Sequence, residues 1–420
     1  MKNWSFAKDN DKLIELVLSG KKTATSFLYS EKYIPTVGEK SIIHFDNEKD
    51  ACEVETVSYK IVKFKDVTSD MAVLEGEGDL SLEYWKNKHY NLFKSIDKNF
   101  NKETKIIFET FNLKNDLVKQ RLKLGERIAY NNLQLLKKVR SIYEINAGYN
   151  NTLFSVNDKY VIKVCNSAKN EKTFEKERDF YLNNQNNRYI PKFFKYDDSK
   201  LIVPFVYEII EKVKGETLYY HWYKMSEEER ECVTNKFVNA IKKFHKTADC
   251  SIDFESKIKS DVSEAINKCK RLFTKEEFKI VMDSLLFYDE ILSKNQFVTI
   301  HNDLHFDNII YYNGNVKIID FNDYIVAPID YEFRLLYMSM EKPWKWANIE
   351  MDPYQKPEDF SHLFDYIKKY YKKLNNIKYL DERMNVYKVH YNAKHLVKYK
   401  LPEQVKDIVD SSKLILEKFM

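Results

Sequence analysis

The chain has 420 residues, a formal net charge of +5, and 44% hydrophobic and 32% charged residues. This composition supports a buried core and excludes an intrinsically disordered chain. The length predicts about two to three domains, and the small charge surplus is too diffuse to predict a DNA-binding protein.

Cysteine usage and hydropathy favour a protein of the reducing cytoplasm. The five cysteines lie far apart and form no C-x-x-C pair, so the sequence predicts neither a zinc site nor a redox pair. The first residues contain no apolar signal core, and no apolar run approaches the roughly 18 residues that cross a bilayer. We therefore expect a cytoplasmic protein with no membrane partner.

Residues 1–113 have the pattern of a small mixed domain. The runs 41–45 and 51–57 alternate apolar and polar residues, as half-buried strands do. Residues 114–138 are polar and leucine-rich with helical spacing, which predicts a helical connector interrupted at Gly125.

Residues 139–215 return to short apolar runs and predict a sheet-rich lobe. The runs 151–156 and 160–164 are expected strands, and Gly148 marks a turn before them. The segment 171–184 has helical spacing with aromatic residues on one face, so we expect a helix there.

Residues 216–420 have mostly helical spacing, broken by one island of strands and loops. Within that island Asn313 and Gly314 separate two apolar runs. This is the strongest local signal for a hairpin, because both residues tolerate positive φ. The hairpin would bring the loop 303–308 close to Asp320.

This loop and hairpin contain the side chains that phosphoryl transfer requires. The reaction needs a carboxylate near the acceptor hydroxyl and oxygen ligands for Mg²⁺. Asp303 fits the first role, and Asn308 and Asp320 fit the second, because Mg²⁺ prefers hard oxygen ligands.

The spacing H-x-D-x-x-x-x-N from His301 to Asn308, followed by D-F at Asp320, resembles the catalytic set of kinases. The form H-N-D-L-H is similar to the aminoglycoside phosphotransferase and choline kinase group. The resemblance covers residue 145 to the C-terminus. It implies a two-lobed protein kinase-like fold and transfer of the γ-phosphate of ATP or GTP to a small-molecule hydroxyl. It also implies Asp303 as base, Asn308 and Asp320 as ligands of the Mg²⁺ cofactor, and His301 as the residue that props the loop.

The same resemblance predicts a nucleotide site in the sheet-rich lobe. Gly148 is the candidate turn over the phosphates, and Lys163, inside a buried strand, is the candidate phosphate-binding lysine. Glu177 falls on the aromatic face of its helix and is the expected ion-pair partner of Lys163. The segment around Ile210 to Val213 resembles the hinge between the lobes, whose backbone would bind the purine.

One further carboxylate lies downstream of the hairpin. Asp330 follows Pro328 at the expected start of a helix, and we predict a structural role for it in tying the catalytic loop down. The sequence does not name the acceptor: aminoglycoside-like, choline-like, amino-sugar and nucleoside molecules all fit the group.

A second resemblance lies in the N-terminal domain. The stretch G-K-K-T-A-T ending at Thr25, the stretch A-V-L-E-G-E-G-D at 72–79, and the later Trp85 and His89 are similar to an ASCH domain. That family implies a PUA-like β-barrel linked to RNA binding, here over residues 13–113.

Some members of this family hydrolyse acylated cytidine with a lysine, a threonine and a glutamate. The matching positions are Lys22, Thr25 and Glu75. A lysine could activate the threonine while the carboxylate moves protons. Hydrolysis, binding of RNA or a modified nucleoside, and a purely structural role all stay open for this domain.

The sequence thus predicts an α+β protein with four parts. They are an ASCH domain (1–113), a helical connector (114–138), a kinase-like N-lobe (139–215) and a helical C-lobe with the catalytic loop and acceptor site (216–420). We expect a Mg²⁺-dependent small-molecule kinase. The alternative is a regulatory protein that binds RNA or a nucleoside and whose kinase-like half senses a ligand.

Overall fold

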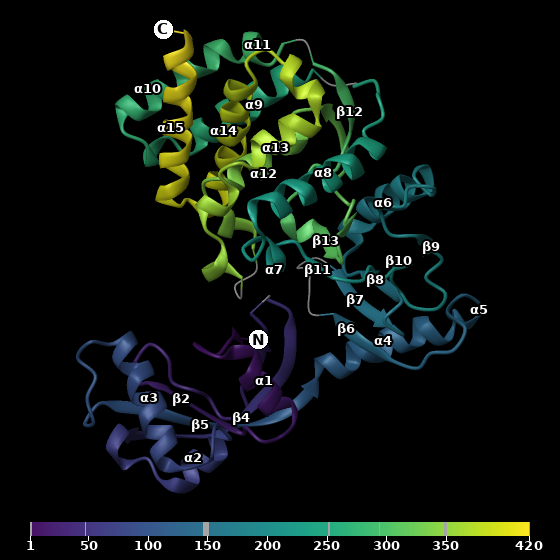
Figure 1. Ribbon diagram of the computed structural model, residues 1–420. Helices are drawn as coiled ribbons and strands as arrows, with labels where there is room; N and C mark the ends of the chain where they lie inside the picture. Colours follow the sequence, from purple (N-terminus) through teal and green to yellow (C-terminus); the bar gives the residue numbers. More distant parts are fainter. Residues whose placement is uncertain are drawn as a thin grey trace. The chain divides into compact units, whose positions relative to one another are not determined.

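The computed structural model describes residues 2–46, 48–145, 151–250, 253–293, 295–347 and 351–419. The chain divides into two compact units, Met1–Asn166 with Asp197–Tyr207, and Ser167–Tyr196 with Glu208–Met420. Figure 1 follows the chain through both. Helices and strands are mixed throughout, as the α+β prediction requires.

The N-terminal domain is built on a five-stranded sheet with the order β1-β3-β4-β5-β2. Its strands are β1 (Lys2–Trp4), β2 (Ala24–Leu28), β3 (Lys40–His44), β4 (Asp50–Lys63) and β5 (Lys105–Asp116). Strand β1 runs parallel to β3, and the other neighbours are antiparallel. The two expected strands are confirmed as β3 and β4, and β4 continues further than its alternating run. Strand β2 lies at one edge of the sheet.

Two apolar clusters join helices to this sheet. The helices are α1 (Asn10–Leu18), α2 (Ser69–Glu75) and α3 (Leu82–Ile96). Trp85 and Phe93 of α3 pack with Phe108 of β5, whereas Ile14 of α1 packs with Phe111 of the same strand. Because Phe108 and Phe111 belong to different clusters, strand β5 contributes to both cores.

The connector is helical, as predicted, but its helix is not interrupted at Gly125. Helix α4 (Leu117–Tyr130) contains Gly125 within its length, and a short α5 (Leu133–Leu136) follows. A Cβ atom at Gly125 would lie 2.7 Å from the ring of Phe154. The glycine therefore permits close packing of the helix on a strand, and it does not end the helix.

Three antiparallel strands follow in the first unit. They are β6 (Ile142–Ile145), β7 (Asn151–Val156) and β8 (Tyr160–Cys165). The expected strands at 151–156 and 160–164 are confirmed. Lys163 of β8 is buried, as its position within an apolar run predicts.

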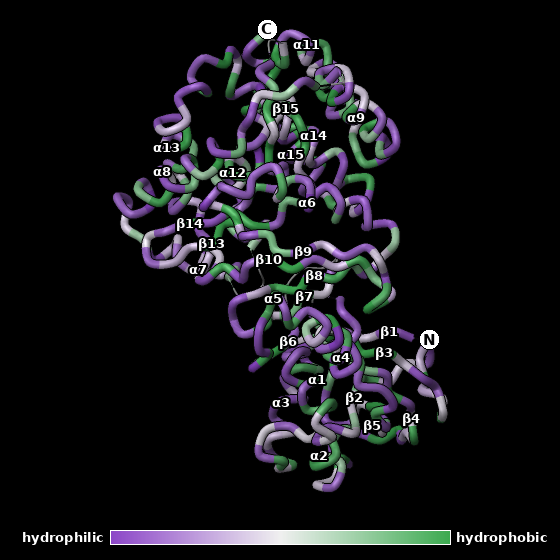
Figure 2. Tube along the Cα trace, turned by 90° about the vertical axis from the view of Figure 1, so that its right-hand side faces the viewer, coloured by the Kyte–Doolittle hydropathy of each residue, from purple (hydrophilic) through white to green (hydrophobic). Residues whose placement is uncertain are grey.

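The second unit is mainly helical. Its helices are α6 (Glu171–Asn183), α7 (Tyr219–Trp222), α8 (Glu227–Phe244), α9 (Phe254–Lys268), α10 (Lys275–Ser284), α11 (Tyr288–Ile291), α12 (Arg334–Ser339), α13 (Leu363–Tyr370), α14 (Leu380–Tyr399) and α15 (Pro402–Phe419). Helix α14 packs against α9 and α15 (Figure 1). Green and purple alternate along these helices in Figure 2, as in amphipathic elements. Within the described residues, every helix is too short or too polar to cross a membrane.

Short strands carry the loops of the second unit. Those wholly within this unit are β11 (Glu216–Thr217), β12 (Phe297–Ile300), β13 (Ile309–Tyr312), β14 (Asn315–Ile318) and β15 (Ile325–Pro328), whereas β9 (Phe193–Asp197) and β10 (Tyr207–Glu211) each have one residue in the first unit. Strands β13 and β14 form the expected hairpin, with Ile309 opposite Ile318. Asn313 and Gly314 at its turn have φ values of 46° and 76°, which explains the Asn-Gly signal.

Candidate active site and N-terminal pocket

The hairpin brings the predicted catalytic residues together. Asn308 directly precedes β13, and Ile319 directly follows β14. The backbone N–H of Ile319 donates to the carbonyl of Asn308 at 3.0 Å, which extends the pairing by one step. Asp320, the next residue, therefore lies beside the loop that contains Asp303.

His301 connects the loop to the end of β14. Its Nδ1 lies 3.3 Å from the backbone N–H of Asp303, and its Nε2 lies 2.8 Å from the carbonyl of Ile319. Nδ1 must accept and Nε2 must donate, so these contacts define the neutral Nε2–H tautomer. The side chain is fully buried, which suits a residue that positions Asp303.

A buried glutamate that the sequence analysis missed anchors the loop. Glu332 accepts hydrogen bonds from the backbone N–H groups of His301 (2.7 Å) and Asn302 (3.2 Å) and from Nε2 of His245 (3.0 Å). Burial alone would raise the pKa of Glu332, but the bonds to His245 and His301 lower it below its ordinary value. Its two oxygens thus fix consecutive backbone groups of the catalytic loop.

The predicted loop anchor, Asp330, is correctly placed but bonded elsewhere. It precedes the short turn Tyr331–Phe333, yet its carboxylate pairs with Arg383 of α14 at 2.6 Å and accepts from Tyr387 at 2.8 Å. The prediction that Asp330 ties the loop down is therefore wrong. Glu332, which binds the loop, comes two residues after Asp330, which binds helix α14.

Arg334 holds the loop from another direction. Its guanidinium donates to the backbone carbonyl of Asn302 at 2.5 Å and to its side-chain oxygen at 3.0 Å. Asn302 has a φ of 71°, a left-handed conformation that asparagine tolerates better than most residues. The bonds to Arg334 and Glu332 stabilise this conformation immediately before Asp303.

Asp303 is an ionised carboxylate in a partly positive environment. Partial burial would raise its pKa, but the hydrogen bond and charge of the nearby His305, together with Arg334, outweigh it and lower the pKa to about 2. Its Oδ2 lies 3.5 Å from Nε2 of His305, and 44% of the side chain is exposed. The carboxylate is thus a permanent hydrogen-bond acceptor open to solvent.

Several side-chain oxygens around the hairpin could hold a divalent cation. Asn308 donates its amide N–H to the carbonyl of Asp303 at 2.7 Å, and its amide oxygen has no hydrogen bond among the described residues. Asp320 and Asp323 add carboxylates, and burial together with the charges of Asp303 and Asp320 raises the pKa of Asp323. Hard oxygen donors in an excess of negative charge suit Mg²⁺.

Glu177 points inward, as its helical face predicts. It is fully buried, and its Oε1 accepts from the backbone N–H of Phe321 at 3.3 Å. Phe180, on the same helix, stacks on Phe321 with the ring centroids 4.0 Å apart. Helix α6 is thus joined directly to the D-F segment that begins at Asp320.

The other residues predicted to bind the nucleotide lie in several different segments of the chain. Ile210 lies in strand β10, and Val213 follows that strand. Gly148 lies outside the described residues. Lys163 and Glu177 belong to different compact units, so their ion pair stays a prediction.

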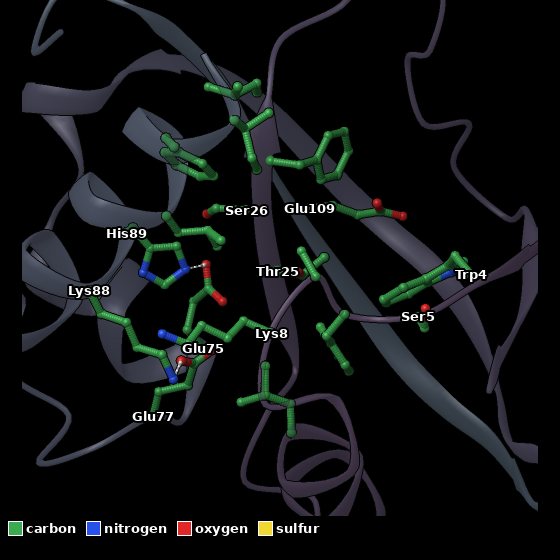
Figure 3. Close-up of a pocket in the computed structure, with 18 of the residues that line it drawn as sticks. Trp4, Ser5, Lys8, Thr25, Ser26, Glu75, Glu77, Lys88, His89 and Glu109 are labelled. Carbon is green, nitrogen blue, oxygen red and sulfur yellow. Dashed lines mark ion pairs between the residues drawn. The ribbon is translucent and has the colours of Figure 1, made fainter. Parts of the chain in front are cut away.

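The N-terminal domain contains a cavity of about 710 Å³ at the edge strand β2. The predicted Lys22, Thr25 and Glu75 all line it. Figure 3 shows His89 and Glu75 on one side of the strand. The structure therefore brings these site residues together.

All three N–H donors of the Lys22 ammonium form hydrogen bonds. Its ammonium donates to Glu75 Oε2 and Glu77 Oε1, both at 2.7 Å, and to the backbone oxygen of Glu75 at 3.2 Å. A lysine has three N–H donors, so none is left for a ligand. The ligand atoms of Glu75, Glu77 and His89 lie within 4.8 Å of one another, but Lys22 already supplies the cation there, and we assign no metal.

Two other polar side chains, His89 and Ser26, line this pocket. Nδ1 of His89 lies 3.1 Å from the carbonyl of Trp85 and must donate to it, which leaves Nε2 as an acceptor 3.9 Å from Glu75. Burial lowers the pKa of His89 and favours this neutral ring. The buried hydroxyl of Ser26 has no hydrogen-bond partner within the described ranges.

These features define a kinase-like catalytic loop in the second unit and a ligand-sized pocket in an N-terminal ASCH domain. The ASCH domain family model matches residues 2–114, and the phosphotransferase enzyme family model matches residues 141–352. The chain therefore belongs to the phosphotransferase enzyme family and begins with an ASCH domain. No curated protein shows significant similarity to it.

Solved structures share the fold of the phosphotransferase part. A streptomycin–ATP–APH(2″)-IIa ternary complex is 20% identical over 70% of this chain and 95% of its own, with a TM-score of 0.50. The GDP complex of wild-type aminoglycoside 2′-phosphotransferase-IIIa is 14% identical over 70% and 97%, with a TM-score of 0.52. An ASCH domain from Lactobacillus crispatus JV V101 is 28% identical over 27% and 78%, with a TM-score of 0.26.

Proposed function

We propose that this protein transfers the γ-phosphate of ATP or GTP to a hydroxyl of a small molecule. The observation that supports this most is the gathering of Asp303, Asn308 and Asp320 around one hairpin, on a loop held by buried hydrogen bonds. Membership of the phosphotransferase family supports the reaction class. The donor and the acceptor are our inference.

Each residue of the loop has a separate task in this proposal. Asp303 accepts a hydrogen bond from the acceptor hydroxyl and orients its oxygen toward the phosphate. Because its pKa is about 2, proton transfer to it is late and its main contribution is orientation. Asn308 and Asp320 would hold Mg²⁺, which neutralises charge on the phosphates when bound.

The nucleotide would be held by the residues that the family resemblance identifies. Lys163 would contact the phosphates and Glu177 would orient that lysine. The turn at Gly148 would cover the phosphates, and backbone groups near Ile210 and Val213 would bind the purine. Backbone contacts of this kind do not distinguish ATP from GTP by side-chain identity.

Phosphate transfer from labelled ATP and GTP, with Mg²⁺, tests the proposal. The acceptor panel contains aminoglycosides, choline, amino sugars and nucleosides, and the Asp303→Asn variant is the control. A product that disappears in the variant would establish the kinase and name its acceptor class. Absence of nucleotide binding would refute it, whereas binding without any product would favour the regulatory alternative.

We also propose that the ASCH pocket binds a modified nucleoside or a nucleotide of RNA. The hydroxyl of Ser26, which is buried without a hydrogen-bond partner within the described ranges and lines the cavity, favours a ligand. Hydrolysis by Lys22, Thr25 and Glu75 stays a further prediction. Titration of the full chain with uridine, modified nucleosides and a short RNA tests binding, and failure of all of them would exclude this ligand class.

A further inference from the structure

The N-terminal pocket has a second polar end, at Glu109. This residue of β5 is paired with Thr25 across the sheet and lines the same cavity. Figure 3 shows Glu109 and Trp4 on one side of β2, and Glu75 and His89 on the other. Glu109 was not among the site residues predicted from the sequence.

Glu109 is the carboxylate of this pocket that lacks a cation. Glu75 and Glu77 are paired with Lys22, and Glu77 also lies 3.1 Å from Lys88. Glu109 accepts one hydrogen bond, from the hydroxyl of Thr56 at 2.6 Å, and forms no ion pair within the described part of the chain. Only 8% of the residue is exposed.

The charged groups nearest to Glu109 do not neutralise it. Lys2 is held by Glu39 at 2.9 Å, and its ammonium lies 4.5 Å from the ring centre of Tyr33. Burial raises the pKa of Glu109, the charge of Glu39 raises it further, and Lys2 opposes the rise. A buried carboxylate without a counter-charge costs free energy that a ligand cation would offset.

The walls around this carboxylate are apolar and aromatic. Trp4, Phe27 and Tyr33 line the cavity together with Glu109. Aromatic faces bind cations as well as flat apolar groups. A ligand that fits this end needs a positive charge next to an apolar body.

We propose that the Glu109 end of the pocket binds a protonated amine carried by a small aromatic molecule. The ammonium would donate to Glu109 while the aromatic body lies among Trp4, Phe27 and Tyr33. This inference rests on the proposal that the pocket holds a ligand, and it narrows the ligand to amine-bearing molecules. A modified nucleoside with an amino substituent would satisfy both proposals.

Two probes that differ in one group test the assignment. Tryptamine carries an ammonium where tryptophol carries a hydroxyl, and calorimetric titration of the full chain compares their affinities. We expect tryptamine to bind about tenfold more tightly, because hydrogen bonds between charged groups are the strong ones. In Glu109→Gln this preference should disappear.

Glu53→Gln is the matched control. Glu53 lies in the same sheet with the same 8% exposure as Glu109, but it does not line the cavity. This variant should keep the preference for tryptamine. Acidification of the wild type gives an independent readout that needs no variant, because the preference should fade as Glu109 becomes protonated.

Several outcomes would overturn the assignment. Equal affinity for both probes, a preference that persists in Glu109→Gln, or tighter binding of indole-3-acetate would each contradict a carboxylate subsite. Uridine binding without any amine preference would leave the nucleoside proposal intact and remove this one. If no probe and no nucleoside binds, both proposals fail.

Discussion

Burial and neighbouring charge act on Asp303 in opposite directions. Desolvation would raise its pKa, whereas His305 and Arg334 lower it, and the balance is a pKa of about 2. The carboxylate is therefore ionised near neutral pH. It is a good hydrogen-bond acceptor and a weak proton acceptor, which suits a reaction in which positioning matters more than covalent chemistry.

We expect Asp303→Asn to lower kcat by roughly 100-fold or more while nucleotide affinity stays near that of the wild type, because the carboxylate acts on the acceptor hydroxyl. Steady-state rates and nucleotide titration measure the two effects separately. Asp365→Asn, at an exposed helical position, is the control. Loss of nucleotide binding in Asp303→Asn would show that the loop has been assigned incorrectly.

Burial and neighbouring groups also set the effect of Glu109 and Glu53 on the stability of the fold, with opposite signs. The folded state raises the pKa of Glu109, so above that pKa its ionisation favours unfolding. The bonds to Asn115 and Lys40 lower the pKa of Glu53, so its ionisation favours folding. Near neutral pH, Glu109→Gln should raise the melting temperature and Glu53→Gln should lower it. Thermal unfolding of both variants checks the signs, and a reversed order would refute the account.

At the scale of elements, the catalytic loop depends on one buried carboxylate. The two oxygens of Glu332 accept from different backbone N–H groups, so in Glu332→Gln the amide NH₂ group would face the N–H of either His301 or Asn302, which cannot accept its hydrogens. We expect the free energy of unfolding to fall by about 3 kcal/mol, as when a buried charged partner is removed. Urea unfolding measures this. Asp365→Asn, whose side chain is 66% exposed, should change it by less than about 0.5 kcal/mol.

Local patterns predicted the elements whose signals are local. The Asn313-Gly314 turn, the helix 171–184 and the strands at 151–164 follow from turn chemistry and periodicity, and the structure contains them. Gly125 was misjudged because its reason is a ring of Phe154 that lies 29 positions away in sequence. A single glycine within a helical pattern can mark either a break in the helix or a close contact with a neighbouring element, and the local sequence does not distinguish the two.

The anchors of the site are non-local, and this is why they were missed. Glu332 binds His301, Asn302 and His245, which come from segments far apart in sequence. Glu77 could have been suspected, since it stands two residues after Glu75, but only the fold shows that both bind Lys22. A motif identifies groups that perform chemistry, whereas their supports depend on packing.

At the scale of the whole molecule, the chain crosses between its compact units more than once. The first unit contains the ASCH domain, the connector and strands β6 to β8, and it also includes Asp197–Tyr207. The boundaries predicted at residues 113, 138 and 215 follow changes in the local sequence pattern. They stay predictions, because the division into compact units is made on a different basis. Compactness depends instead on contacts between distant segments.

Thermal unfolding of the intact chain tests whether it binds a nucleotide in a metal-dependent way. A ligand that binds only the folded state stabilises it, by about 2.7 kcal/mol at a hundredfold excess over Kd. A non-hydrolysable ATP analogue with Mg²⁺ should thus raise the melting transition of the phosphotransferase part by roughly 5 to 10 °C. Differential scanning calorimetry measures this shift, and chelation of Mg²⁺ should remove most of it.

Asp320→Ala should abolish the Mg²⁺-dependent part of that shift, because this carboxylate would link the ion to the phosphates. Asp381→Ala, on the surface of α14, should keep the shift and serves as the control. If Asp320→Ala retains the full stabilisation, Asp320 is not a metal ligand. If neither ATP nor GTP analogues shift the transition in the wild type, nucleotide binding itself is refuted, and the hairpin that gathers Asp303, Asn308 and Asp320 would need another explanation.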